Sequence, residues 1–311
     1  MKTKSILLGA LALTMLAACD NDDDQGFPRD GQVTFTATIG GQYVTRAYDT
    51  SWDKNDKIGI SGTGYTNVPY QTANADGDFT VAPNVSPIYY QDGSTVTFTA
   101  YYPWNKLEQG TKTIAADTWG QAEQKSFDFL WAQATGSNGS GPVAFEFAHK
   151  MTKVVLTIVP GDDVSSYDVK NAVLSLEGFK HAGTFNVETG ETATTDASTA
   201  MWEFANNTET AAYNAPLVDN EDGSISYTLI LFPQVFGSPL PIFAETPGLT
   251  FSTTLDFTAA NRSAKDEEPK NEWVAGRQYN MRVTLNKTDI SVSGCTIGKW
   301  EEADGGTADA Y

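Results

Sequence analysis

Few residues in this chain of 311 could carry out chemistry. It has two histidines, His149 and His181, and two cysteines, Cys19 and Cys295. A metal site needs several such ligands at close spacing, and these four residues form no recognisable ligand pattern. A nucleophilic pair of Cys295 with a histidine is conceivable, but no local signature accompanies it. A lone cysteine in a strand is usually a small buried apolar residue.

Carboxylates are abundant, with 39 Asp and Glu in total, so chance pairs resembling a glycosidase site are expected and indicate nothing. Asp53 and Asp56 lie in a polar turn that could hold a metal, but the turn lacks the glycine-bearing loop of a calcium site. The sequence also lacks a phosphate-binding glycine loop and a nucleophile elbow. We therefore predict no catalytic residues, no metal, no cofactor and no enzymatic activity.

The first residues predict export from the cytoplasm. Lys2 and Lys4 precede a short apolar run, and small residues lead up to Cys19, so residues 1–18 have the features of a secretory signal peptide. The cysteine resembles the lipobox of bacterial lipoproteins, in which this thiol is acylated, for example with palmitate, and becomes the mature N-terminus. Two or three acyl chains hold a protein stably to a membrane. The alternative is an ordinary signal peptide followed by an incidental cysteine.

Residues 19–31 form a predicted acidic tether, with too little apolar content to fold. An acidic run after a lipid-bearing cysteine resembles the export signal that sends lipoproteins of Bacteroidota to the outer face of the outer membrane. A solvated spacer is the other interpretation. Without residues 1–18 the net charge falls from −19 to −21, because that segment carries two lysines and no acid. Such a charge excludes nucleic acid partners and docking on anionic lipid head groups. No segment after residue 18 is long and apolar enough to be a transmembrane helix, which leaves a lipid as the only expected membrane attachment.

The remainder of the chain has the pattern of short β-strands. Val33, Phe35, Ala37 and Ile39 alternate with threonines, which is typical of a half-buried strand. Turns are expected at residues 76–77, 92–93 and 189–190, and a flexible loop at 135–142. Further strands are predicted at residues 57–61, 79–81, 95–102, 127–132, 143–148, 153–159, 169–176, 183–187, 224–232, 249–257, 279–285 and 290–297.

Many short strands between turn residues indicate an all-β chain. Its length favours two β-sandwich domains in tandem, of transthyretin-like or Greek-key type, at residues 32–147 and 148–311. The large aromatic residues are expected to fill cores or cover sheet edges, with ligand stacking as the alternative. They are Trp52, Tyr101, Trp273 and Trp300.

Several sequence blocks in a fixed order resemble the fimbrillin family, the two-domain pilins and pilin-like lipoproteins of the type V pilus in Bacteroidota. These blocks lie at residues 45–60, 70–79, 98–103, 145–151, 183–190, 273–280 and 290–300. The resemblance implies a protein of fimbria assembly and cell adhesion, located at the outer membrane or in fimbriae. Its implied partners are other pilus subunits and a surface receptor.

The family resemblance also implies a role for Arg46. In polymerising fimbrillins an arginine-specific protease cuts in the loop after the first strand, here between Arg46 and Ala47. The segment with Val33, Phe35, Ala37 and Ile39 would then be the removable strand, and a strand from a neighbouring subunit would fill the groove. Cleavage would also separate the chain from the lipid on Cys19. A plain solvated loop residue is the alternative interpretation of Arg46.

The C-terminal end is a weaker candidate for a donated strand. Residues 301–311 are polar, whereas residues 290–297 alternate better. A tip or accessory subunit tolerates a poor terminal donor, so this position in the pilus is favoured over a stalk position. The alternative function is a surface glycan-binding lipoprotein that does not polymerise and that stacks sugars on exposed Trp and Tyr.

Overall fold

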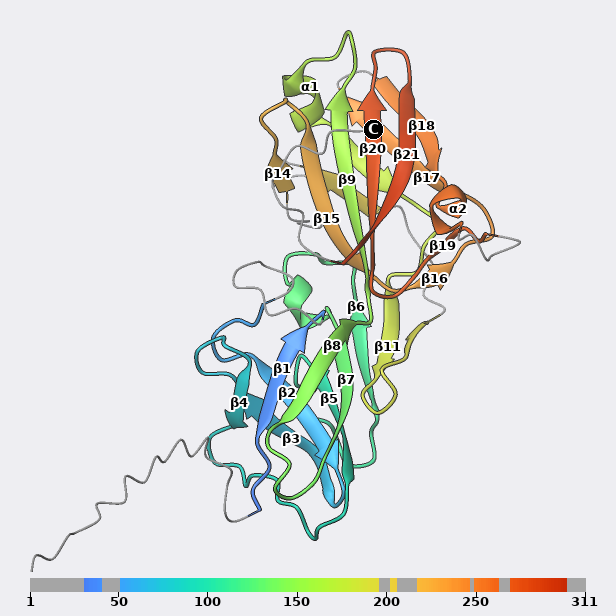
Figure 1. Cartoon of the computed structure of the whole chain (residues 1–311). Helices are drawn as coiled ribbons and strands as arrows, with labels where there is room; N and C mark the ends of the chain where they lie inside the picture. Colours follow the sequence, from blue (N-terminus) through green and yellow to red (C-terminus); the bar gives the residue numbers. More distant parts are fainter. Residues whose placement is uncertain are drawn as a thin grey trace, which may run out of the picture.

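The structure is a computed structural model with two lobes stacked end to end (Figure 1). No helix among the described residues is long and apolar enough to cross a membrane. Cys19, Arg46 and Ala47 lie outside the described residues. The described ranges are 31–40, 51–195, 202–205, 217–246, 249–262 and 269–300.

Strands of the N-terminal lobe pair in the closed order β1-β4-β3-β2-β5-β7-β8. The ring consists of a sheet β4-β1-β8 and a sheet β3-β2-β5-β7, and short pairings of β3 with β4 and of β7 with β8 join their edges. It is thus a closed barrel made of two sheets that are connected at both sides. Its strands are β1 (Phe35–Ile39), β2 (Lys57–Gly62), β3 (Tyr65–Gln71), β4 (Asp78–Val81), β5 (Val96–Tyr102), β7 (Leu130–Gly136) and β8 (Val143–His149).

The C-terminal lobe is an open sandwich. One sheet has the order β14-β15-β9-β20-β21 and the other β13-β10-β17-β18, with a small pair β16-β19 at one side. Its elements are β9 (Thr152–Pro160), α1 (Ser166–Asn171), β10 (Val173–Leu176), β13 (Trp202–Ala205), β14 (Leu217–Asp219), β15 (Ile225–Leu231), β16 (Gln234–Val235), β17 (Leu240–Thr246), β18 (Leu249–Leu255), α2 (Thr258–Asn261), β19 (Glu272–Trp273), β20 (Arg277–Leu285) and β21 (Ile290–Lys299).

A third group of elements joins the two lobes. β6 (Thr113–Asp117) pairs with β11 (Ala182–Asn186), which pairs with β12 (Thr192–Thr194), and the 3-10 helix η1 (Gln124–Ser126) follows β6. Figure 1 shows β6 and β11 side by side at the junction. A separate apolar cluster lies here, with residues from both lobes, among them Phe129, Phe185 and Trp300. The lobes are therefore packed against each other, and the predicted domain limits at 147 and 148 remain a prediction.

The all-β fold class predicted from the sequence is confirmed, with some local differences. The strand predicted at 127–132 begins only at Leu130 and continues to Gly136, into the predicted loop, because Gly136 pairs with Val96. The strand predicted at 169–176 is half helix, since Ser165 caps α1 and its side chain accepts a hydrogen bond from Asp168 N. The strands that were not predicted are β3, β6, β12, β13, β14, β16, β17 and β19.

Candidate functional site

β1 is a central strand, with partners on both edges. It pairs antiparallel with β4 at Phe35 and Thr36, and parallel with β8 along its whole length from Phe35 to Ile39. Further main-chain bonds continue this pairing beyond the ladders, including Ala37 N to Gly77 O at 2.8 Å. Removing β1 would leave two rows of main-chain donors and acceptors without partners, which is costly inside a fold.

The alternation of β1 places its apolar side chains in the core. Val33, Phe35, Ala37 and Ile39 are all buried, whereas the threonines between them are half-buried. The Phe35 ring contacts Tyr70 edge-on at 4.9 Å between ring centroids, and the Phe98 and Phe145 rings at 5.4 and 5.7 Å. Each large apolar side chain buried in this way contributes about 1.5–3 kcal/mol. The prediction that Val33, Phe35, Ala37 and Ile39 form the buried face of a strand is confirmed.

Two residues approach the middle of β1 at the Ala37 carbonyl oxygen. Trp52 donates a hydrogen bond from Nε1 to the Ala37 carbonyl oxygen at 2.9 Å, and its ring contacts Phe79 and Phe147 edge-on. Gly77 has a φ of +83°, and a Cβ at this position would lie 2.4 Å from the same carbonyl oxygen. The turn predicted at 76–77 thus serves to bring the chain close to β1.

Polar groups gather where β1 ends and leads into residues 41–50. A pocket of about 30 Å³ is lined by Ile39, Asp56, Tyr102 and His149, among others. Burial raises the pKa of Asp56 to about 6, although the hydrogen bond from Tyr102 Oη at 3.2 Å works against this rise. His149 Nδ1 lies 2.9 Å from Asp128 Oδ1. These groups pair with one another and form no cluster of ligands.

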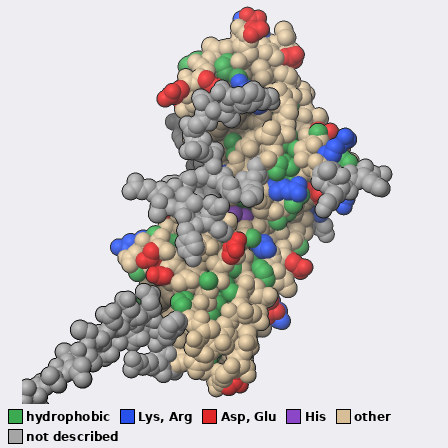
Figure 2. All heavy atoms as spheres, in the orientation of Figure 1, with side chains coloured by type: hydrophobic (Ala, Val, Ile, Leu, Met, Phe, Trp, Pro, Cys, Tyr) green, Lys and Arg blue, Asp and Glu red, His purple; other side chains and the backbone are tan. Residues whose placement is uncertain are grey.

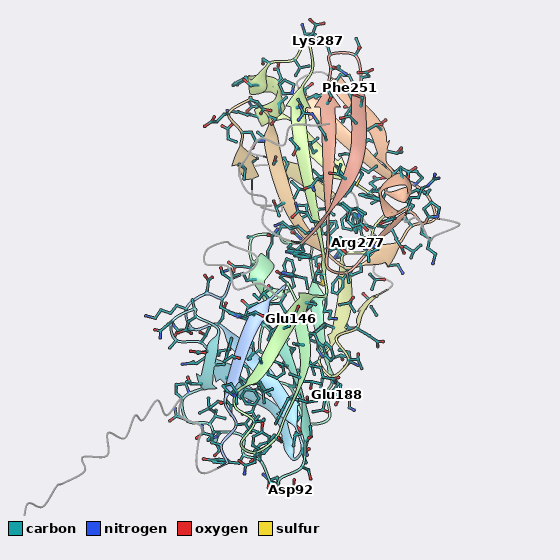
Figure 3. All side chains as sticks on the ribbon, viewed as in Figure 1. Asp92, Glu146, Glu188, Phe251, Arg277 and Lys287 are labelled. Atoms are coloured by element: carbon teal, nitrogen blue, oxygen red, sulfur yellow. The ribbon has the colours of Figure 1, made fainter. Side chains whose placement is uncertain are left out.

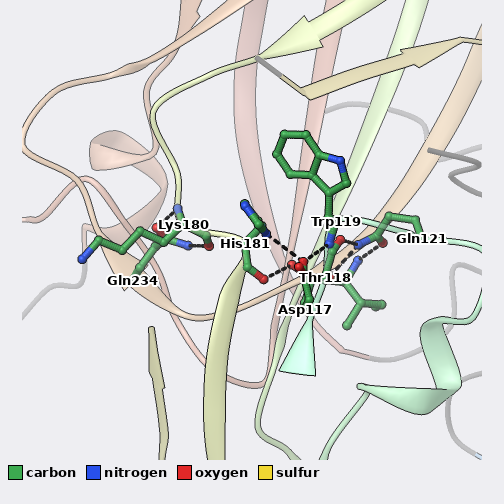
Figure 4. Close-up of polar contacts among 8 residues, drawn as sticks. Asp117, Thr118, Trp119, Gln121, Lys180, His181 and Gln234 are labelled. Atoms are coloured by element: carbon green, nitrogen blue, oxygen red, sulfur yellow. Dashed lines mark hydrogen bonds and ion pairs between the residues drawn. The ribbon is translucent and has the colours of Figure 1, made fainter. Parts of the chain in front are cut away.

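The residues considered for metal binding and catalysis are placed apart. The main-chain N–H of Asp53 donates to Asp56, so the two form a closed turn, and the described residues contain no group of three or more His, Cys, Asp and Glu suited to a metal. Burial raises the pKa of Cys295 to about 12, which favours the unreactive thiol. His181 Nδ1 lies 2.7 Å from Asp117 Oδ1 and faces Trp119 (Figure 4).

The aromatic residues singled out from the sequence are buried, as predicted for core residues. Trp52, Tyr101, Trp273 and Trp300 are each less than a tenth exposed. Trp300 stacks on the His149 ring at 4.0 Å between centroids. Stacking of a ligand on these residues is thereby excluded. Figure 2 shows acidic side chains spread over both lobes of the visible face, without one dominant acidic surface.

Sequence reasoning missed the residues that join the two lobes. Gln121 is fully buried, donates to the Ile230 carbonyl oxygen at 3.0 Å and accepts from the Ile230 N–H at 2.8 Å. Gln124 donates to the Thr228 carbonyl oxygen at 2.8 Å. β14 pairs only with residues 225–227 of β15, so these glutamines complete the edge of β15 beyond β14. A lone glutamine in a polar segment carries no sequence signal for such a role.

Comparisons with known proteins agree with this architecture. A Bacteroides uniformis protein named "Putative fimbrium subunit" is 28% identical over 318 residues, which covers 98% of each chain. A Bacteroides ovatus protein named "Putative fimbrium tip subunit" is 26% identical over 186 residues, covering 50% of this chain and 35% of that protein.

A solved structure agrees over most of both chains. The crystal structure of a "putative cell adhesion protein" from Bacteroides uniformis has a TM-score of 0.67 and 26% identity, and covers 88% of this chain and 100% of its own. The sequence profile described as fimbrillin-like matches residues 45–300, beginning just after β1 and ending at the Trp300 that stacks on His149. The resemblance seen in the sequence is confirmed, and the chain belongs to the fimbrillin-like family.

Proposed function

We propose that this protein is a fimbrial subunit of the cell surface that acts in adhesion and assembles by exchange of β1 for a strand of a neighbouring subunit. The observation that carries the proposal is the position of β1 between β4 and β8. An incoming strand in the vacated groove would regain both ladders and fill the trough that Phe35 and its apolar neighbours occupy. Such a role needs no catalytic residue.

The connection of β1 to the rest of the chain fits removal by a protease. Residues 41–50, which contain Arg46 and Ala47, form the only covalent link between β1 and the remainder of the N-terminal lobe. A cut between Arg46 and Ala47 would leave β1 held by non-covalent contacts alone. The same cut would release the subunit from a lipid on Cys19, so an uncut copy would stay anchored to the outer membrane.

A tip or accessory position is the finer part of the proposal. It is supported by the similarity of half the chain to the Bacteroides ovatus protein named as a tip subunit. It is also supported by the polar composition of residues 301–311, which makes this segment a poor donor strand. A terminal subunit needs an acceptor groove but has no need to donate a strand at both ends.

The test is the N-terminus and intact mass of the protein recovered from the cell surface and from sheared fimbriae. We expect fimbrial protein to begin at Ala47 and anchored precursor to begin at acylated Cys19. Arg46→Lys should block the cut and keep the protein out of fimbriae. Arg29→Lys is the matched control, because a chain cut after Arg29 would still contain β1. Fimbrial protein that begins at Cys19 with Arg46 intact would refute strand removal.

The alternative of a glycan-binding lipoprotein that does not polymerise, through exposed stacked aromatics, has less support. Among the described residues Tyr167 is the only large aromatic side chain in the set of strongly exposed apolar residues, at 73% exposure. A single exposed ring makes no platform for stacking a glycan chain.

A further inference from the structure

A sizeable cavity lies at the far end of the C-terminal lobe. It has a volume of about 300 Å³, at the lower end of the range of about 300–1,000 Å³ that is usual for small-ligand sites. Figure 3 shows Phe251 and Lys287, two of its lining residues, at the outer end of this lobe. The β1 groove is in the other lobe, so a ligand in this cavity and a donated strand would not compete for space.

The cavity has an apolar floor and wall. Val164 and Phe251 are partly buried and pack against the core of the C-terminal lobe, and Leu285 is fully buried within that core. Hydrogen bonds fix the walls in place, including Gly161 N to Leu285 O at 2.9 Å and Asn286 N to Asp289 O at 2.9 Å. These bonds hold the side of the cavity formed by Leu285 and Asn286 in place.

Polar side chains surround this apolar surface. Asp168 Oδ2 accepts hydrogen bonds from Ser165, and Asn286 Nδ2 donates to Asp289 Oδ1 at 2.6 Å. The other polar atoms of these side chains, Asp168 Oδ1 and Asn286 Oδ1, and Lys287 Nζ make no hydrogen bond among the described residues. Hydrogen bonds from Ser165 lower the pKa of Asp168, and the nearby Lys287 adds to this lowering, so the Asp168 carboxyl is ionised at neutral pH. The rim thus offers acceptors, a donor and charges that cancel.

These features select a ligand class. A strongly charged ligand gains little, because Asp168 and Lys287 offset each other. A sugar ring has hydroxyl groups that both donate and accept hydrogen bonds, and a C–H face that packs on an aromatic ring such as Phe251. We propose that the cavity lined by Val164, Asp168, Thr246, Phe251, Asn286 and Lys287 binds a neutral saccharide of about one or two rings.

This inference gives the proposed adhesin a ligand, but it rests on the cavity and not on strand exchange. A failure here would leave the N-terminal processing of the surface protein unchanged. A failure of processing at Arg46 would leave saccharide binding unchanged. The two proposals are thus tested separately.

The experiment is saturation-transfer-difference NMR on the full mature chain with glucose, galactose, mannose, N-acetylglucosamine and disaccharides of each, at about 10 mM, where millimolar affinity is detectable. We expect transfer to the ring C–H protons of at least one sugar. Phe251→Leu, which keeps an apolar residue, should weaken binding by about tenfold. Lys287→Ala, at an exposed turn, should also weaken it without affecting the fold.

Tyr167→Ala is the matched control, because this exposed aromatic residue is next to Asp168 but does not line the cavity. It should leave saccharide binding unchanged. Absence of transfer to every sugar would overturn the proposal, as would equal loss of binding in Phe251→Leu and Tyr167→Ala. Binding of a blocked alanine dipeptide in place of the sugars would overturn it in favour of a peptide site.

Discussion

Replacing Phe35 by alanine tests whether β1 contributes to the N-terminal lobe as its contacts indicate. The ring is buried and contacts Tyr70, Phe98 and Phe145, so its removal deletes apolar burial and leaves a cavity bounded by three rings. Buried Phe→Ala changes cost about 3–5 kcal/mol. At about 2–4 °C per kcal/mol for a protein of this size, a loss of about 4 kcal/mol lowers the melting temperature by about 8–16 °C.

The matched control is Thr36→Ala, one residue along the same strand with a half-buried side chain on the opposite face. It should change the free energy of unfolding by less than about 1 kcal/mol. Both variants are measured by differential scanning calorimetry and by urea unfolding of the mature chain. In protein cut after Arg46 and freed of residues 31–46, the difference between the two variants must disappear, since neither position remains.

Equal effects of Phe35→Ala and Thr36→Ala would refute the reasoning, as would a loss below about 1 kcal/mol for Phe35→Ala. Either result would mean that β1 is not held by its apolar face. The proposed groove would then have no apolar trough for a donated strand to fill.

Three further predictions concern the surroundings of β1 and the junction of the lobes. Gly77→Ala should destabilise the N-terminal lobe by about 1–3 kcal/mol, because φ is positive and the new Cβ meets the Ala37 carbonyl oxygen. Faster amide hydrogen exchange in β1 should report this loss, and unchanged protection of β1 would contradict the prediction. Burial raises the pKa of Asp56 from its ordinary 3.8 to about 6 in the folded protein, so protonation of this carboxyl favours folding. Its stabilisation is therefore present below about pH 4 and is lost as the pH rises to about 6. Asp56→Asn should remove this dependence of the unfolding free energy on pH. Gln121→Met should lower the unfolding free energy by about 2–4 kcal/mol, because both main-chain groups of Ile230 lose their partner; a change below about 1 kcal/mol in thermal or urea unfolding would contradict it.

The strands that the sequence predicted well are those with a regular pattern. β1 alternates strictly, and residues 153–159 and 224–232 are apolar runs that correspond to β9 and β15, paired with each other in the C-terminal sheet. Gly59 lies inside the predicted strand at 57–61, and a Cβ there would lie 2.4 Å from the Tyr101 ring, so this glycine marks a close approach. Such strands can be predicted because the period of the apolar residues and the positions of glycines are visible within a short stretch of sequence.

The elements that were missed depend on distant partners. β6 consists of residues 113–117, whose alternation is weak and whose side chains are mostly exposed, and only its pairing with β11 makes it a strand. Residues 169–171 of α1 were predicted as part of a strand, because Val169, the one buried residue of α1, fits a strand pattern as well as a helix pattern. The sequence also predicted no residue of the cavity at Phe251, since three stretches that are distant in the sequence meet there, at residues 164–168, 246–251 and 285–287.

The way in which Gln121 and Gln124 complete the edge of β15 has a mechanical consequence. A tension pulling the two lobes apart must break, together, the glutamine hydrogen bonds, the β6–β11 ladder and the His149–Trp300 stack. Among the described residues, each of these junction contacts is at least partly buried or lies within a ladder. The subunit should therefore transmit force as a stiff rod, and its rupture under load should be governed by one barrier for the whole junction and not by gradual extension.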